Sequence, residues 1–85
     1  MEEIKVLFTR GGGSYIVQYG EKFYLLDIER PELKALMNNY VEAFLKWGYC
    51  DDVDQSTITP KMLQTMKEII YNDPRDMNAR EKQHK

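Results

Sequence analysis

The chain has 85 residues, of which 42 % are hydrophobic and 31 % are charged, as is usual for one small globular domain. No stretch approaches the about 20 apolar residues that a membrane span needs, so we expect no membrane contact. Cys50 is the only cysteine, which excludes an internal disulfide and favours a reducing compartment. The acidic N-terminus lacks the features of a secretory signal, so we expect a cytoplasmic protein.

Charge divides the chain into a body and a tail. Residues 1–74 carry eight Lys and Arg against twelve Asp and Glu, whereas residues 75–85 carry four against two. An acidic body repels phosphates, so nucleic acid is a less expected partner than protein. The basic tail holds one large apolar side chain, Met77, and we expect it to be flexible and disordered beyond a single domain at residues 1–74.

The first third of the sequence predicts three strands. Apolar residues alternate in residues 3–9, 15–19 and 22–28, as they do in half-buried strands. The glycine-rich tip at residues 10–14 and the two-residue turn Gly20-Glu21 would connect the strands as hairpins. We therefore expect a three-stranded antiparallel meander with the second strand in the centre.

The rest of the chain predicts two helices. Apolar residues recur at helical spacing from Leu33 onward, so we expect a helix from Pro31 to about Gly48. A polar linker should follow at residues 51–57. Thr59 and Pro60 are a typical cap and first residue for a second helix that stops before Pro74. The expected fold is α+β, with both helices packed on one face of the three-stranded sheet.

The hairpin registers, with Phe8 opposite Ile16 and Leu7 opposite Val17, assign the side chains to two sheet faces. The face expected under the helices is hydrocarbon: Ile4, Val6, Phe8, Ile16, Phe23 and Leu25. The predicted core comprises Val6, Phe8, Ile16, Phe23, Leu25, Leu36, Tyr40, Phe44, Leu63 and Met66. The opposite face carries tyrosines and lysines, namely Tyr15, Tyr19, Tyr24, Lys5 and Lys22. We expect it to be an interface, for a homodimer first and for single-stranded nucleic acid second.

The sequence offers no catalytic or metal-binding set. His84 is the only histidine and lies in the predicted tail, so a zinc site has too few ligands. A calcium loop beginning at Asp52 would need glycine and glutamate where Thr57 and Leu63 stand. The glycine tip lacks the lysine of a phosphate-binding loop. We expect no enzyme activity and no cofactor.

An acidic cluster follows the first predicted helix. Asp51, Asp52 and Asp54 come shortly after Trp47 and Tyr49. A solvated linker is the simplest explanation. The alternative is an anionic patch that occupies a basic surface of a partner protein.

The element order and one stretch of sequence resemble a known family. The stretch is Tyr40-Val-Glu-Ala-Phe-Leu-Lys-Trp-Gly48 leading into Asp51-Asp52-Val-Asp54, and the resemblance covers about residues 4–72. The chain is similar to small phage or mobile-element anti-CRISPR proteins that inhibit Cas9. The resemblance implies a protein partner with a basic surface, such as a Cas nuclease whose DNA-reading arginines would meet Asp51, Asp52 and Asp54.

Overall fold

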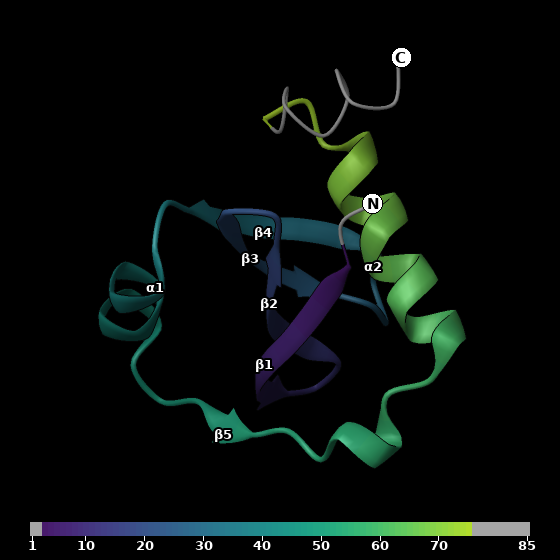
Figure 1. Cartoon of the computed structure of the whole chain (residues 1–85), viewed down its shortest axis with the longest axis horizontal. Helices are drawn as coiled ribbons and strands as arrows, with labels where there is room; N and C mark the ends of the chain where they lie inside the picture. The colour runs from purple at the N-terminus through teal and green to yellow at the C-terminus, as the bar shows by residue number, and fades with distance from the viewer. Residues whose placement is uncertain (1–2, 76–85) are drawn as a thin grey trace.

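A computed structural model describes residues 3–75 (Figure 1). The sheet has five antiparallel strands in the order β4-β3-β2-β1-β5, so β2 is central, as expected. In chain order the elements are β1 (Ile4–Gly11), β2 (Ser14–Tyr19), β3 (Lys22–Asp27), β4 (Glu32–Met37), α1 (Tyr40–Trp47), β5 (Asp51–Asp52), the 3₁₀ helix η1 (Gln55–Thr57) and α2 (Pro60–Asn72).

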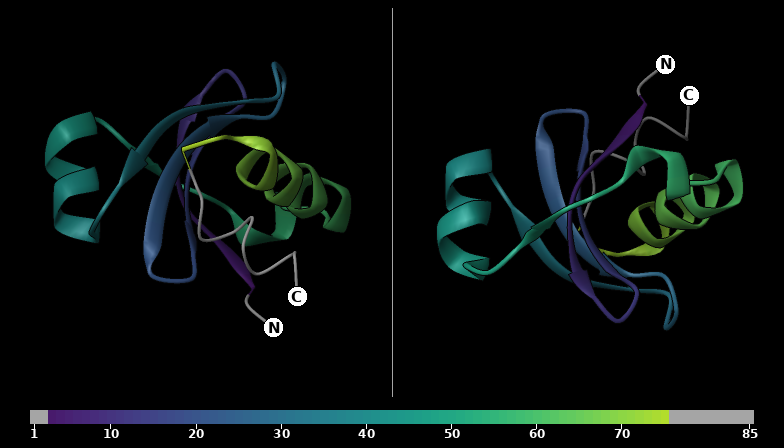
Figure 2. Two further views of the ribbon diagram at one scale, coloured as in Figure 1. Left: turned by 90° about the horizontal axis from the view of Figure 1, so that it is seen from above. Right: turned by 90° about the horizontal axis from the view of Figure 1, so that it is seen from below.

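The two helices lie on opposite faces of the sheet (Figure 2). The expectation of three strands with both helices on one face is therefore wrong, although the α+β class is right. Each face has its own core. The core between α2 and the sheet contains the buried residues Ile4, Val6, Val17, Tyr24, Leu26, Leu33, Met66, Ile69 and Ile70. The core between α1 and the sheet contains the buried residues Ile16, Phe23, Leu25, Met37 and Ala43.

The segment at residues 31–37 was expected to be helical and is mostly the strand β4. Leu33 and Leu36 belong to the core under α2, whereas Ala35 and Met37 belong to the core under α1. A strand that is covered on both faces carries apolar residues without strict alternation, and such a run is easily mistaken for a helix. The tertiary arrangement, with a helix on each side, explains this error.

The first helix begins nine residues later than Pro31. Asn39 caps it, because its side-chain oxygen accepts a 2.7 Å hydrogen bond from the backbone N–H of Glu42. Its end matches the prediction: Gly48 has a φ of +61°, and its N–H donates to the carbonyl of Phe44 at 3.0 Å. The second helix, α2, has the predicted Thr59 cap and the predicted bounds.

The β1–β2 hairpin contains a bulge that overturns part of the face assignment. Phe8 lies opposite Ile16 as expected, but Val17 lies opposite Val6 and not Leu7. Leu7 is the extra residue, so the alternation of side chains reverses there. Ile4 and Val6 consequently lie under α2, on the tyrosine face, whereas Phe8 lies on the α1 face. The β2–β3 hairpin has the predicted register, with Tyr19 opposite Lys22.

The predicted core is right where it relied on the strands and less so where it relied on the first helix. Val6, Ile16, Phe23, Leu25 and Met66 are buried. Phe8, Leu36 and Leu63 are partly buried. Tyr40 and Phe44, by contrast, are 44 % and 45 % exposed.

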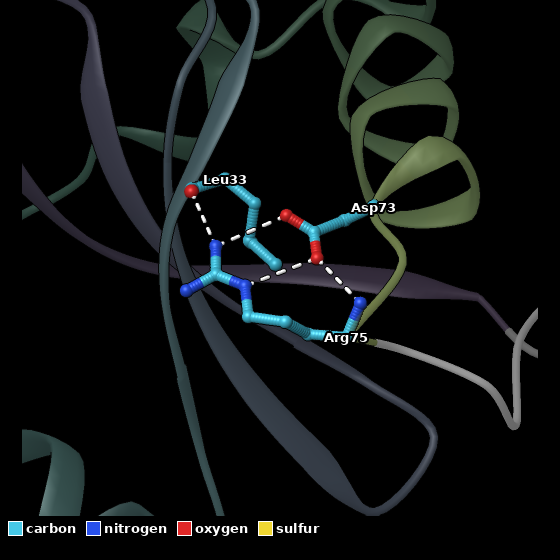
Figure 3. A network of polar contacts seen from close by, with 3 residues as sticks. All are labelled: Leu33, Asp73 and Arg75. Carbon is cyan, nitrogen blue, oxygen red and sulfur yellow. Dashed lines mark hydrogen bonds and ion pairs between the residues drawn. The ribbon is translucent and has the colours of Figure 1, made fainter.

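Side chains donate to carbonyl groups on the outer strand β4 and on the part of β1 that the short strand β5 does not cover. On β1, the amide of Gln55 donates to the Val6 carbonyl at 2.8 Å. On β4, Arg75 donates to the Leu33 carbonyl at 2.6 Å and pairs with Asp73 at 3.0 Å (Figure 3). Arg75 is the first residue of the predicted tail and is thus tied to the sheet. The rest of that tail, including Met77 and His84, lies outside the described residues.

One buried carboxylate shapes the turn between β3 and β4. Asp27 accepts hydrogen bonds from the backbone N–H groups of Glu29 at 2.9 Å and Arg30 at 3.1 Å. Lys34 pairs with it at 3.7 Å. The hydrogen bond from Arg30 is the largest cause of a lowered pKa at Asp27, with smaller contributions from Glu29 and Lys34.

The two-sided core gives a first prediction. Ile70→Ala should lower the free energy of unfolding by about 2–5 kcal/mol, because Ile70 of α2 is fully buried against the sheet. Phe44→Ala should cost only roughly 1–2 kcal/mol, although phenylalanine is larger, because its ring is 45 % exposed. Urea denaturation of both variants would measure the difference. A larger loss for Phe44→Ala would contradict the described position of α1.

Asp27 gives a prediction on pH. Its pKa is lower in the folded chain than the ordinary 3.8, so its charge stabilises the fold above about pH 4. That contribution is lost as the pH falls through the lowered folded pKa. Asp27→Ala should therefore unfold more easily than the parent at pH 7, and the difference should shrink between about pH 5 and pH 2. Asp51→Ala, at an exposed carboxylate, is the control in the same thermal melts.

Candidate interaction surface

Three aromatic rings form a partly exposed cluster beside α1, which we term the aromatic surface: Phe8, Tyr40 and Phe44. The ring of Phe8 lies 5.6 Å from Phe44 and 5.8 Å from Tyr40, centre to centre. The ring centres of Tyr40 and Phe44 are 6.3 Å apart, and the two rings are stacked with their planes at 26°. Below them, Phe23 meets Tyr40 edge-on at 5.9 Å. Mutual contact of this kind holds large side chains in place at the surface.

The short length of α1 explains why these rings stay exposed. The helix has eight residues, and Ala43 is the only one of them that is buried. Its last turn is fixed by Trp47, whose indole N–H donates to the sulfur of Met37 at 2.9 Å. The Arg10 guanidinium lies 5.5 Å from the centre of the Trp47 ring. The helix is therefore held to the sheet mainly through Ala43 and Trp47, and the rings of Tyr40 and Phe44 remain partly open to solvent.

Asp52 borders the aromatic surface. In the antiparallel pair β1–β5, Asp52 lies directly opposite Phe8, and Asp51 lies opposite Thr9. Directly opposed residues place their side chains on the same sheet face, so Asp52 lies on the α1 face with Phe8. Asp51 lies on the other face. Both are exposed, and within residues 3–75 neither forms an ion pair.

Asp54, the third carboxylate of the predicted cluster, has a structural role. It accepts hydrogen bonds from the hydroxyl of Ser56 at 2.7 Å and from the N–H of Ser56 at 3.0 Å, which caps η1. The hydroxyl bond is the main cause of a lowered pKa at Asp54. The structure therefore separates Asp54 from Asp51 and Asp52. Tyr49, at 89 % exposure, is the most exposed large apolar side chain of the described chain.

The tyrosine face is covered rather than open. Tyr24 is 1 % exposed in the core under α2, and Tyr15 and Tyr19 are half-buried against the same core. Lys5 is exposed and Lys22 half-buried at its edge. The sequence predicted an open tyrosine face because both helices were expected on the opposite side of the sheet.

Sequence reasoning missed two exposed residues of α1. Val41 and Leu45 belong to the apolar residues that recur at helical spacing, which are typical of a buried stripe, yet they are 63 % and 77 % exposed. One signal was available. The apolar residues Tyr40, Val41, Phe44, Leu45 and Trp47 surround too much of an eight-residue helix to face a single core.

Comparison with models of known protein families, with curated proteins and with solved structures yields no match. Within the described residues, no helix is long and apolar enough to cross a membrane. Residues 3–75 also contain no group of three or more His, Cys, Asp or Glu that could hold a metal ion.

The exposure of these side chains gives a third prediction. Tyr49→Ser and Leu45→Gln should each change the melting temperature by less than about 3 °C, because neither removes buried surface. Differential scanning fluorimetry would measure both, with Met66→Ala as the destabilised reference. A loss in either variant as large as that of Met66→Ala would show that the side chain supports the fold.

Proposed function

We propose that this protein is a non-enzymatic interaction protein that binds a protein partner through the aromatic surface and the adjoining Asp52. The observation that carries the proposal is the position of the Asp52 carboxylate beside three partly exposed rings that contact one another. Large aromatic side chains dominate the binding energy of protein interfaces when they are buried by a partner. Here the rings are already ordered by one another, so binding would cost little conformational entropy.

The chemistry of the surface suggests a basic partner. An arginine can stack on an aromatic ring and pair with a carboxylate at the same time. Phe44 and Tyr40 offer the rings, and Asp52 offers the charge. We therefore propose an arginine-bearing protein surface as the binding partner. The sequence resemblance makes a guide-loaded Cas9 the first partner to test.

The structure gives no support to the alternative of single-stranded nucleic acid stacked on the tyrosine face. Stacking needs rings whose faces are open to bases. Tyr24 is buried, and α2 covers Tyr15 and Tyr19. We do not propose this function.

A paired capture experiment tests the proposal. The parent and the double variant Phe44→Gln/Asp52→Asn would be immobilised and exposed to host lysate and, separately, to guide-loaded Cas9. We expect at least about tenfold weaker capture by the variant, since it loses one aromatic anchor and one charge-assisted hydrogen bond. The matched control is Tyr71→Gln/Glu68→Gln, which changes an exposed tyrosine and glutamate on α2.

Quantitative mass spectrometry of the lysate fraction and biolayer interferometry of Cas9 would read out the result. Proteins that the parent and the control retain equally, and the double variant loses, would be the partners. If no protein distinguishes the parent from the double variant, the proposed surface is wrong. If Cas9 alone fails to bind, only the partner suggested by the resemblance is wrong.

A further inference from the structure

The side of α1 that points away from the sheet differs from the aromatic surface. It carries four exposed residues, which we term the outer face of α1: Val41, Glu42, Leu45 and Lys46. Val41 and Leu45 are 63 % and 77 % exposed, and a shallow hollow is lined by these four residues and Asn39. Two strongly exposed aliphatic side chains in adjacent turns are unusual unless something covers them.

The four residues form two parallel rows along the helix. Positions four apart lie one above the other, so Val41 and Leu45 form an apolar row and Glu42 and Lys46 form a charged row beside it. Within the described chain, Glu42 and Lys46 form no ion pair with each other or with another residue. Both charges are therefore available to a partner.

This pattern is complementary to itself. In a pair of antiparallel helices related by a two-fold axis, each row faces the same row of the other helix in reversed order. Val41 then meets the second copy's Leu45, and Glu42 meets the second copy's Lys46. A parallel two-fold arrangement would instead place the charged row of each helix opposite the apolar row of the other. We propose that two copies of this protein associate through the outer face of α1, packed antiparallel.

Other features of the structure favour a second copy over another partner. The outer face carries one acid and one base, so neither a strongly basic nor a strongly acidic surface would match it. Pairing of sheet edges, the other common route to a dimer, is hindered by Gln55 on β1 and Arg75 on β4. The proposal is independent of the function proposed above, because the aromatic surface lies on the opposite flank, towards the sheet.

The size of the face predicts a weak dimer. A helix of eight residues is only about 12 Å long, so the contact should bury less than the roughly 800 Å² per partner of a standard interface. We expect a dissociation constant on the order of 10–100 µM. Sedimentation equilibrium over a concentration series that spans this range would show the mass rising from monomer to dimer.

A charge swap tests the antiparallel geometry. Glu42→Lys and Lys46→Glu should each weaken the dimer by about tenfold, since each replaces two attractive pairs by two repulsive ones. The double variant Glu42→Lys/Lys46→Glu restores opposite charges across the interface and should recover dimerisation. Glu68→Lys and Lys61→Glu make the same charge changes at exposed positions on α2 and should leave the dimer unchanged.

Leu45→Gln is a second, uncharged test of the apolar row, and thermal melts would confirm that each variant is folded. Dimerisation that survives Leu45→Gln, or that the double swap does not recover, would overturn the proposed interface. A parent that stays monomeric at 1 mM would overturn the dimer altogether. Loss of dimerisation with unchanged partner capture would leave the proposed function intact.

Discussion

The bulge at Leu7 is the constraint on which the rest of the structure depends. It reverses the alternation of side chains within β1, so that Ile4 and Val6 enter the core under α2 and Phe8 points to the other face. Phe8 is then the residue against which Tyr40 and Phe44 pack, and it lies opposite Asp52 on β5. Without the extra residue, Phe8 would lie under α2, and the aromatic surface would lose its base.

The two helices cover the two faces of the sheet to different extents. α2 has thirteen residues and buries Met66, Ile69 and Ile70 against one face, which makes that layer the main source of hydrophobic stability. α1 has eight residues and buries only Ala43 completely. The smaller core on the α1 side contributes less to stability, but it leaves aromatic rings and aliphatic side chains exposed at the surface. The main hydrophobic core and the surface that we propose for binding thus lie on opposite faces of one sheet.

The polar contacts at the sheet edges restrict how the protein can associate. Gln55 and Arg75 donate to carbonyl groups on β1 and β4, where an incoming strand would otherwise bind. Both donors come from the segments that flank α2, so docking of this helix also protects both edges. The surfaces that we propose for association, those of α1 and the exposed Asp52 of β5, lie away from both of these edge contacts.

The sequence by itself determined the elements whose signals are local: the Gly20-Glu21 turn with its register, the central position of β2, and α2 with its Thr59 cap and Pro60 start. The start of α1 was not among them, because the sequence predicted a helix from Pro31 whereas the structure caps it at Asn39. Tertiary structure decided the rest. Residues 32–37 form a strand because helices cover both of their faces, and two residues of the acidic linker form β5 because β1 offers an open edge. Contacts between distant segments decide which side chains of α1 are buried, and hence where the candidate surface lies. Such contacts leave no periodic signal in the sequence.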